Sequence, residues 1–389
     1  MPWGERRVVH LREEFVLRAM EPGANVSAVC RELGVSRKTG YKWLARYRTM
    51  GLEGLADMSR RPHRSLHATS GEVVLRVIEL RRAHPRWGPK KIVALLAREG
   101  LPKVPSVRTV ARILERAGEP PARRRARAST NVPREAPRVS AELPNDVWSV
   151  DFKGWWKTKD GRRAEPLTVR DGASRFVLCA HLVQGTRTTE VRSVFERLFE
   201  QHGLPRAIQV DNGTPFASTR ARGGLTRLSA WWVSLGIRVV RSRPAHPQDN
   251  GAHERMHVDM HFDVERHRAD TLEQQQDALD RWRAEFNAVR PHEALGMRTP
   301  SEVYRKSPRP YRGEREPHYA ANALVRAVAA NGRVALGSQG SVFISQALHG
   351  WRVALEPLAN DSYRVWFFEM DLGVVSDEQF GGSRRRTVA

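Results

Sequence analysis

Three carboxylates stand out by the places they take in the predicted secondary structure. Asp151 lies inside a predicted strand, within Trp148-Ser149-Val150-Asp151-Phe152, and Asp211 ends a short strand directly before Asn212-Gly213. Glu254 falls in the first turns of a predicted helix. Carboxylate oxygens are hard ligands that hold Mg²⁺ while leaving coordination positions open to water and phosphate oxygens. Two such ions about 3.5–4 Å apart would activate an attacking oxygen and stabilise a leaving oxygen, which is chemistry suited to a phosphodiester bond.

Each carboxylate alone is weak grounds for a site, because an aspartate at a strand end is usually a turn former or a helix cap. The joint occurrence of the three on suitable elements is what favours a site. Other aspartates are interpreted as turn or strand-end residues: Asp146, Asp160 and Asp171. Three histidines offer nitrogen ligands that could suggest zinc: His246, His253 and His257. Zinc ligation is disfavoured because zinc needs a closed set of nitrogen and sulfur ligands that this segment does not offer.

The elements around these residues alternate in a defined order. Three strands are followed by a helix, a strand, a helix, a strand and two helices, an order that predicts an RNase H-like α/β fold. In such a sheet the first and fourth strands are neighbours, so Asp151 and Asp211 should face one another, with Glu254 reaching in from a helix. The predicted ranges are Val147–Lys157, Pro166–Arg170, Arg175–Val183, Thr189–His202, Ala207–Asp211, a helix around Trp231 and Trp232, Ile237–Val240, Asn250–His267 and Leu272–Val289. Four tryptophans are assigned either to the core or to stacking on DNA, and the pattern does not separate these roles: Trp155, Trp156, Trp231 and Trp232.

Residues 8 to 50 predict three helices, at about Val8–Met20, Ser27–Leu33 and Ser36–Tyr47. Ser27 and Ser36 are expected to cap two of them, and Gly34 suits the end of the middle one. The spacing is typical of a helix-turn-helix. Its second helix would present three basic side chains to DNA: Arg37, Lys38 and Lys42. Three side chains would pack inward: Val35, Trp43 and Leu44. Gly40 should cost this helix about 1 kcal/mol relative to alanine. The alternative is a small helical bundle with an incidental turn.

A second helical set runs from Glu72 to Gly118, with Pro89 near the start of one helix and Ser106 capping another. It is interpreted as a second helix-turn-helix or winged-helix-like domain, with Lys90 and Lys91 as DNA contacts. A linker of proline and arginine follows, where proline disfavours both helix and sheet. It is expected to lie along phosphates, with a nuclear-localisation signal as the competing interpretation of its arginines: Arg123, Arg124, Arg125 and Arg127.

Short apolar runs punctuated by glycine follow Pro308 and Pro310, and they predict a small SH3-like β-barrel with a basic tail. The chain as a whole therefore predicts a multidomain protein. The expected boundaries are 1–60 and 61–118 for the two DNA-binding domains, 119–145 for the linker, 146–306 for the catalytic core and 307–389 for the barrel and tail.

Composition agrees with a polyanionic partner. The 389 residues include 66 Lys and Arg against 43 Asp and Glu, a formal net charge of +23. Residues 1 to 140 hold 30 basic and 13 acidic side chains, so most of the excess lies in the first third of the chain. Such a block favours nucleic acid, because each cation that neutralises a phosphate also releases a counterion. A generally basic proteome is the alternative. The two cysteines argue against a disulfide framework, and no segment predicts a membrane span or a signal peptide.

The run from Trp148 to Pro300 resembles the integrase core of bacterial insertion-sequence transposases and, more distantly, that of retroviral integrases. The segments that carry the resemblance are Trp148-Ser149-Val150-Asp151, Val210-Asp211-Asn212-Gly213-Thr214-Pro215-Phe216, Leu235-Gly236-Ile237, the run from Pro244 to Arg255, Asn287, the run from Arg290 to Leu295, and Thr299-Pro300. The flanking helical and β-rich segments also resemble that family, so the likeness covers nearly the whole chain.

This resemblance implies that Asp151, Asp211 and Glu254 form a triad that binds two Mg²⁺ ions, with Mn²⁺ able to substitute. It further implies that four residues support the active-site floor: Asn212, Gly213, Gln248 and Asn250. The sequence departs from the family in two places. The 43 positions from Asp211 to Glu254 exceed the retroviral interval, and an inserted surface loop at Ser218–Leu225 would account for the excess. His261 occupies a position where the family usually has lysine, and histidine is only partly charged at neutral pH.

The resemblance therefore implies a DNA transposase. It would bind the terminal repeats of its element, hydrolyse phosphodiester bonds at the 3′ ends and join those ends to target DNA, acting on double-stranded DNA as a dimer or larger homo-oligomer. It is expected in the bacterial cytoplasm at the nucleoid, away from membranes. Two alternatives remain: a DNA-binding regulator that has lost strand transfer, as His261 would allow, and an RNase H-like nuclease of RNA hybrids or junctions.

Overall fold

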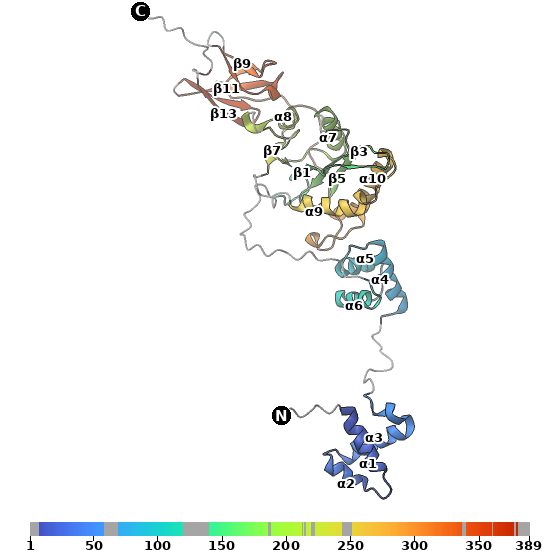
Figure 1. The fold of residues 1–389 in the computed structure, drawn as a ribbon. Coiled ribbons are helices and arrows are strands. Elements are labelled where there is room, and N and C mark those ends of the chain that lie inside the picture. Colours follow the sequence, from blue (N-terminus) through green and yellow to red (C-terminus); the bar gives the residue numbers. More distant parts are fainter. Residues whose placement is uncertain are drawn as a thin grey trace, which may run out of the picture. The chain divides into compact units, whose positions relative to one another are not determined.

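A computed structural model of the chain describes residues 8–57, 69–119, 140–185, 188–211, 213, 215–218, 222–242, 251–336, 340–359, 361–376 and 379. The chain divides into two compact units, Met1–Gly71 and Glu72–Ala389. The first holds a helical bundle, and the second holds further helices, a mixed α/β core and a C-terminal β-rich part (Figure 1).

The first unit is built from three helices around one small apolar core. Helix α1 spans Val8–Met20, α2 spans Val26–Glu32 and α3 spans Arg37–Met50. Gly34, between α2 and α3, has a φ of 65°, the left-handed conformation that glycine adopts at low cost. The side chains at the centre are Phe15, Val16, Cys30, Trp43, Leu44 and Leu55. The three predicted helices are therefore confirmed.

The caps of these helices follow the prediction at one site and depart from it at another. The Ser36 side chain accepts a hydrogen bond from the Thr39 amide, as expected. Helix α2, however, is capped by Asn25, whose side chain accepts from the amides of Ser27 and Ala28. The prediction that Ser27 is the cap is wrong because Asn25, in an extended conformation, already satisfies two of the first free amides.

Gly40 in α3 is explained by close packing. A Cβ atom at this position would lie 2.5 Å from Cys30 Sγ and 2.6 Å from Phe15 Cζ. The glycine therefore lets α1 and α2 approach α3, which offsets the loss in helix propensity.

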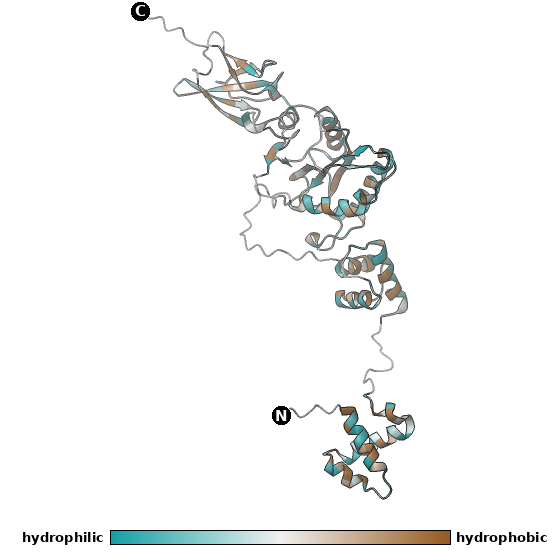
Figure 2. Ribbon diagram, in the orientation of Figure 1, coloured by the Kyte–Doolittle hydropathy of each residue, from teal (hydrophilic) through white to brown (hydrophobic). Residues whose placement is uncertain are grey.

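Three more helices begin the second unit: α4 at Gly71–Ala83, α5 at Pro89–Arg98 and α6 at Val107–Arg116. Ser106 caps α6 through the Thr109 amide, and Pro89 opens α5, both as predicted. Each helix carries hydrophobic and hydrophilic residues (Figure 2). The apolar side chains form one cluster: Val77, Leu80, Trp87, Ile92, Leu95, Leu96, Val110 and Leu114.

A five-stranded sheet forms the centre of the second unit, in the order β5-β4-β1-β6-β7. Strand β1 pairs antiparallel with β4 and parallel with β6. The predicted adjacency of the first and fourth strands, and with it the RNase H-like order, is confirmed. The strands are β1 Val147–Phe152, β4 Pro166–Asp171, β5 Val177–Leu182, β6 Ala207–Val210 and β7 Arg238–Arg241.

Strand β1 is shorter than the predicted range Val147–Lys157. It ends at Phe152, and Gly154 turns the chain with a φ of 88°. The next residues form a separate small hairpin, in which β2, Trp156–Lys157, pairs with β3, Arg163–Ala164. A central glycine thus divides one apparent strand into two.

The two faces of the sheet are covered by different helices. One face packs in a large apolar cluster with α7, Thr188–His202, and α8, Arg227–Ser234. The other face packs against α9, Gly251–Met260, and α10, Leu272–Ala288. A π-helical turn, His261–Glu265, extends α9, and the short α11 spans Pro300–Val303. Three of the four tryptophans are buried and one is exposed: Trp156, Trp231 and Trp232 against Trp155.

The C-terminal part consists of an open sheet and a hairpin. The sheet has the order β13-β12-β11-β8, and β9 pairs only with β10. The described strands do not close into a barrel, so the predicted SH3-like barrel is not shown. The strands are β8 Leu324–Ala327, β9 Arg333–Ala335, β10 Ser341–Phe343, β11 Arg352–Leu358, β12 Ser362–Phe367 and β13 Met370–Ser376. Among the described residues, no helix has the length and apolar character needed to cross a membrane.

The segment Ser218–Leu225, expected as an inserted loop before β7, packs against the C-terminal sheet at its described end. Leu225 is 1% exposed and belongs to the apolar cluster of that sheet. A Cβ on Gly223 would lie 2.8 Å from side-chain carbons of Leu372 and Met370. The interpretation of Ser218–Leu225 as a surface loop is therefore wrong for its described end, which packs between α8 and β13.

Candidate active site

Asp151 lies on β1, and Asp211 directly follows the neighbouring parallel strand β6. The pairing of β1 with β6 sets Val147 opposite Ala207 and Ser149 opposite Gln209. Continued by two residues, the same register sets Asp151 opposite Asp211, which directly follows β6. In-register residues of parallel strands point to the same face, so the two carboxylates belong to one face of the sheet. The Gly213 amide donates to Asp211 Oδ1 over 3.1 Å, which orients that carboxylate.

Helix α9 is fixed to this face through a threonine and two histidines. Thr168, opposite Asp151 in the β1–β4 register, donates its hydroxyl proton to the Asp151 carbonyl oxygen. The Nε2 atoms of His253 and His257 lie 2.7 and 2.8 Å from Thr168 Oγ1. Since a hydroxyl has one proton and two lone pairs, both histidines are donors here.

Burial keeps both histidines uncharged. It lowers the pKa of His257 to about 3, with further lowering from Lys153 and Arg170. Burial also lowers the pKa of His253 well below its usual range, assisted by His257 and Arg170. They therefore act as neutral hydrogen-bonding residues at physiological pH.

Glu254 lies one helical turn before His257, whose ring approaches Asp151. His257 Nδ1 lies 4.0 Å from Asp151 Oδ2. Glu254 precedes His257 by three residues, and residues so spaced are neighbours on one helix face. Glu254 itself is exposed. Among the described residues, no group of three His, Cys, Asp or Glu side chains is placed to hold a metal ion. The register puts the two aspartates on one face of the sheet, and Glu254 lies on the helix that covers that face.

Several predicted residues lie outside the described ranges. They are Asn212, Gln248 and Asn250 near the candidate site, and Arg123, Arg124, Arg125 and Arg127 in the linker; His246 of the zinc alternative also falls there. The three aspartates interpreted as turn or strand-end residues accept hydrogen bonds from nearby or adjoining backbone amides. Asp146 accepts from the Leu143 amide, Asp160 from the Arg162 amide and Asp171 from the Asn145 amide.

His261 forms part of a charged cluster in the π-helical turn. Its Nδ1 lies 2.9 Å from Glu265 Oε2, and Lys153 Nζ lies 3.0 Å from the same oxygen. Burial acts to raise the pKa of Glu265, but the hydrogen bonds from His261 and Lys153 outweigh it and hold the pKa below its ordinary value. Glu265 is therefore ionised at neutral pH.

The predicted DNA contacts of α3 are accessible. Arg37, Lys38 and Lys42 are exposed, whereas Trp43 and Leu44 are buried and Val35 packs at the edge of the same core. This arrangement has the two faces that a recognition helix requires.

Lys90 and Lys91 instead lie against the core of the second unit. Lys90 forms an ion pair with Glu293. Burial lowers the pKa of Lys91 to about 8, with further lowering from Arg290. The prediction that these two lysines bind DNA stays a prediction, and in this structure both lie at the contact with the core.

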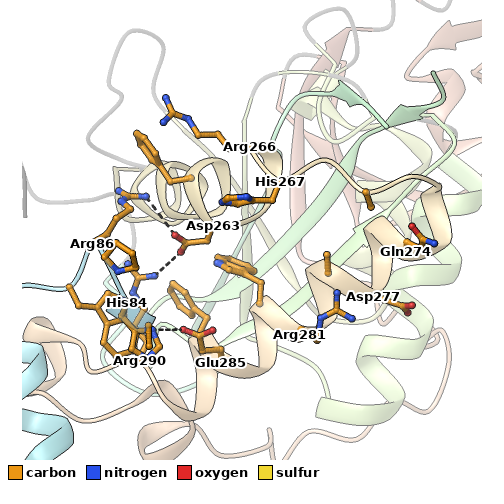
Figure 3. A pocket seen from close by; sticks show the side chains of 18 residues that line it. His84, Arg86, Asp263, Arg266, His267, Gln274, Asp277, Arg281, Glu285 and Arg290 are labelled. Carbon is orange, nitrogen blue, oxygen red and sulfur yellow. Dashed lines mark hydrogen bonds and ion pairs between the residues drawn. The ribbon is translucent and has the colours of Figure 1, made fainter. Parts of the chain in front are cut away.

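The same contact contains several ion pairs (Figure 3). Asp259 of α9 lies 2.7 Å from Arg290 and 3.4 Å from Arg86, which precedes α5. His84 lies 3.1 Å from Glu285 of α10. A pocket of about 920 Å³ lies beside these groups. Helix α9 therefore contacts the helical bundle as well as the sheet.

Sequence reasoning missed Thr168 and undervalued the two histidines. The available signal was the alternation in β1, where Trp148 and Val150 belong to the apolar cluster and the intervening Ser149 and Asp151 do not. Such alternation marks a polar face of a buried strand. It does not reveal which residue of β4 lies opposite.

Family comparisons agree with this architecture. Models described as an integrase core domain match residues 141–247 and 235–300. Residues 141–300 are thus similar to an integrase core domain. Upstream of that core, a helix-turn-helix domain matches residues 11–63 and a homeodomain-like domain matches 39–114, which confirms the prediction of N-terminal DNA-binding modules.

Two proteins similar to this chain come from insertion elements. A 39.2 kDa protein of insertion element IS476 from Xanthomonas euvesicatoria is 29% identical over 58% of this chain and 63% of its own length. A 31.7 kDa protein of insertion element IS407 from Burkholderia multivorans is 28% identical over 59% of this chain and 80% of its own length. The chain thus spans less than two thirds of the first relative.

Solved structures similar to the chain include viral integrases. The HTLV-2 integrase catalytic core domain in complex with magnesium is 18% identical, with a TM-score of 0.33, over 42% of this chain and 98% of that one. The simian T-cell lymphotropic virus intasome in complex with a PP2A regulatory subunit is 17% identical, with a TM-score of 0.38, over 77% and 99%.

Proposed function

We propose that the chain is a DNA transposase that cuts at the 3′ ends of its element and joins them to target DNA. The observation that carries this proposal is the β1–β6 register, which sets Asp151 opposite Asp211 on the face covered by α9. Glu254 supports it, because it lies one turn before His257, whose ring contacts Asp151. The insertion-element origin of the relatives agrees with this function.

The donor set fits magnesium. Asp151, Asp211 and Glu254 offer carboxylate oxygens, the ligands that Mg²⁺ prefers, and Mn²⁺ accepts the same set. Bound there, two Mg²⁺ ions would supply Lewis-acid activation of the attacking oxygen and stabilisation of the leaving one. The chain's own part is to hold these residues in place: Thr168 fixes the backbone of Asp151 through its carbonyl, and the Gly213 amide orients the Asp211 carboxylate.

The DNA-binding part of the proposal rests on the N-terminal modules. Helix α3 would enter the major groove at the element's terminal repeats, with Arg37, Lys38 and Lys42 toward the duplex. Because two ends must be joined, we expect a dimer or larger assembly on double-stranded DNA, acting in the bacterial cytoplasm at the nucleoid.

One observation favours a second candidate, a regulator that binds the ends without cutting them. His261, at a position where the family usually has lysine, is engaged by Glu265 over 2.9 Å. Both candidates bind the ends of the element, but only the transposase cuts and joins them.

The test is magnesium-dependent cleavage and joining of labelled DNA that carries the ends of the element encoding this chain. Glu254→Gln keeps the side-chain shape and removes its charge, so we expect cleavage to fall at least a hundredfold, about 2.7 kcal/mol in the barrier, while binding persists. Glu273→Gln, an exposed glutamate on α10, is the matched control and should keep full activity. A native chain that binds the ends and never cuts them would favour the regulator.

A further inference from the structure

Lys153 lies on the same face of the sheet as Asp151. Its amide donates to the Pro166 carbonyl over 3.1 Å, which extends the β1–β4 pairing by one residue beyond Phe152. Side chains alternate along a strand, so residues two apart share a face. Lys153 also contributes to lowering the pKa of His257, the residue beside Asp151. The lysine therefore belongs to the surroundings of the candidate active site.

The Lys153 side chain is held in place. It is only 16% exposed, and its Nζ lies 3.0 Å from Glu265 Oε2. An ammonium has three donors, and Glu265 accepts one of them. Within the described part of the chain Glu265 is the one hydrogen-bond partner of this ammonium, so two donors are left for a further acceptor without breaking the ion pair. A lysine ordered in advance loses less conformational entropy on binding than a freely moving one.

We propose that Lys153 binds a phosphate of the DNA strand next to the bond that is cut, and that Glu265 positions its ammonium for this contact. The inference rests on the proposed function, because it takes the substrate at this face to be a DNA strand. A fixed cation suits this place, since a phosphodiester approaching three carboxylates is otherwise repelled. His261, on the other side of Glu265, adds a second donor to the same cluster.

A purely structural role makes a different prediction. If the Lys153–Glu265 pair only ties β1 to the π-helical turn, removing either partner should do equal damage, since each leaves the other charge unpaired. If Lys153 binds phosphate, removing Lys153 should weaken DNA binding, whereas removing the Glu265 charge should not.

The experiment compares three full-length variants on end DNA. Lys153→Gln and Glu265→Gln test the pair, and Lys159→Gln is the matched control, because Lys159 forms a similar ion pair with Asp270 but is 65% exposed. Binding is measured without divalent metal, on DNA with ordinary linkages and on DNA with one neutral methylphosphonate at each of the linkages nearest the cut in turn. Joining is measured separately with magnesium.

We expect Lys153→Gln to weaken binding of ordinary DNA about tenfold, the effect of one charge-assisted contact. On DNA neutralised at the contacted linkage, Lys153→Gln and the native chain should bind alike. Glu265→Gln should bind at least as tightly as the native chain, because its amide oxygen still accepts from Lys153 while a negative charge is removed. Lys159→Gln should match the native chain. Lys153→Arg, which keeps the charge, should restore binding to within about threefold of native.

Equal losses in Lys153→Gln and Glu265→Gln would overturn the proposal, as would a Lys153→Gln loss that persists on every methylphosphonate DNA. If Lys153→Gln does not fold, Glu265→Gln and Lys153→Arg decide the question. Both keep the cation, so both should lose affinity when the contacted linkage is neutralised, and unchanged binding on every methylphosphonate DNA would overturn the proposal. Failure of the proposed function is visible separately, as native chain that binds the ends and shows no magnesium-dependent cutting.

Discussion

The hydroxyl group of Thr168 accepts hydrogen bonds from two buried histidines of α9. Thr168 Oγ1 contacts Nε2 of His253 and of His257, and it donates to the Asp151 carbonyl. Thr168→Val keeps the shape but leaves two buried ring N–H groups without an acceptor, at about 1–3 kcal/mol each. We expect a clear fall in the temperature of unfolding and a loss of cleavage, because α9 and Asp151 are no longer fixed together.

Thr168→Ser is the control for that substitution, since it retains the hydroxyl and loses one methyl group. Its activity and unfolding temperature, followed by scanning calorimetry, should remain near native. Equal behaviour of the valine and serine variants would show that the hydrogen bonds contribute little.

Helix α9 joins two parts of the second unit, and Asp259 is its contact with the helical bundle. The carboxylate is buried, 2.7 Å from Arg290 and 3.4 Å from Arg86. Asp259→Ala leaves these guanidinium groups without their main partner, and breaking a buried pair costs about 3–5 kcal/mol. We expect faster amide hydrogen exchange in α4, α5 and α9, measured by mass spectrometry.

Asp277→Ala removes an exposed aspartate from α10 and should leave that exchange unchanged. Protection in α4 and α5 that survives Asp259→Ala would mean that apolar packing alone holds the bundle on the core.

At the scale of helices and strands, much of the architecture could be predicted from the sequence. Strand order followed from the succession of elements, and Ser36, Ser106 and Pro89 marked helix starts because caps depend on neighbouring residues only. Gly40 was misjudged, since its partners Phe15 and Cys30 come from other helices. The engagement of Lys91 by the core was likewise hidden, because periodicity identifies a helix face and not what covers it.

For the whole molecule, the uneven charge predicts how DNA binding depends on salt. Each phosphate neutralised by a lysine or arginine contributes about 0.9 to the slope of log affinity against log salt. The double variant Lys38→Gln, Lys42→Gln should therefore lower that slope by up to about 2. The measurement is fluorescence anisotropy of end DNA over a series of salt concentrations.

A matched double variant uses two arginines of the same bundle that lie off α3, Arg18→Gln and Arg31→Gln. Its slope should stay closer to that of the native chain. Equal slopes for the two doubles would mean that α3 is not the face that meets the duplex.

Helix α9 also limits how this chain can change in length. Glu254 stands in its first turn and Asp259 five residues later, so the proposed metal ligand and the contact with the bundle share one short helix. Each residue of a helix advances the direction of the side chain by about 100°. A single-codon insertion or deletion between the two positions would therefore turn one of them away from its partner. We expect lineages of this protein to vary in residue type along this segment while the five-residue interval stays constant.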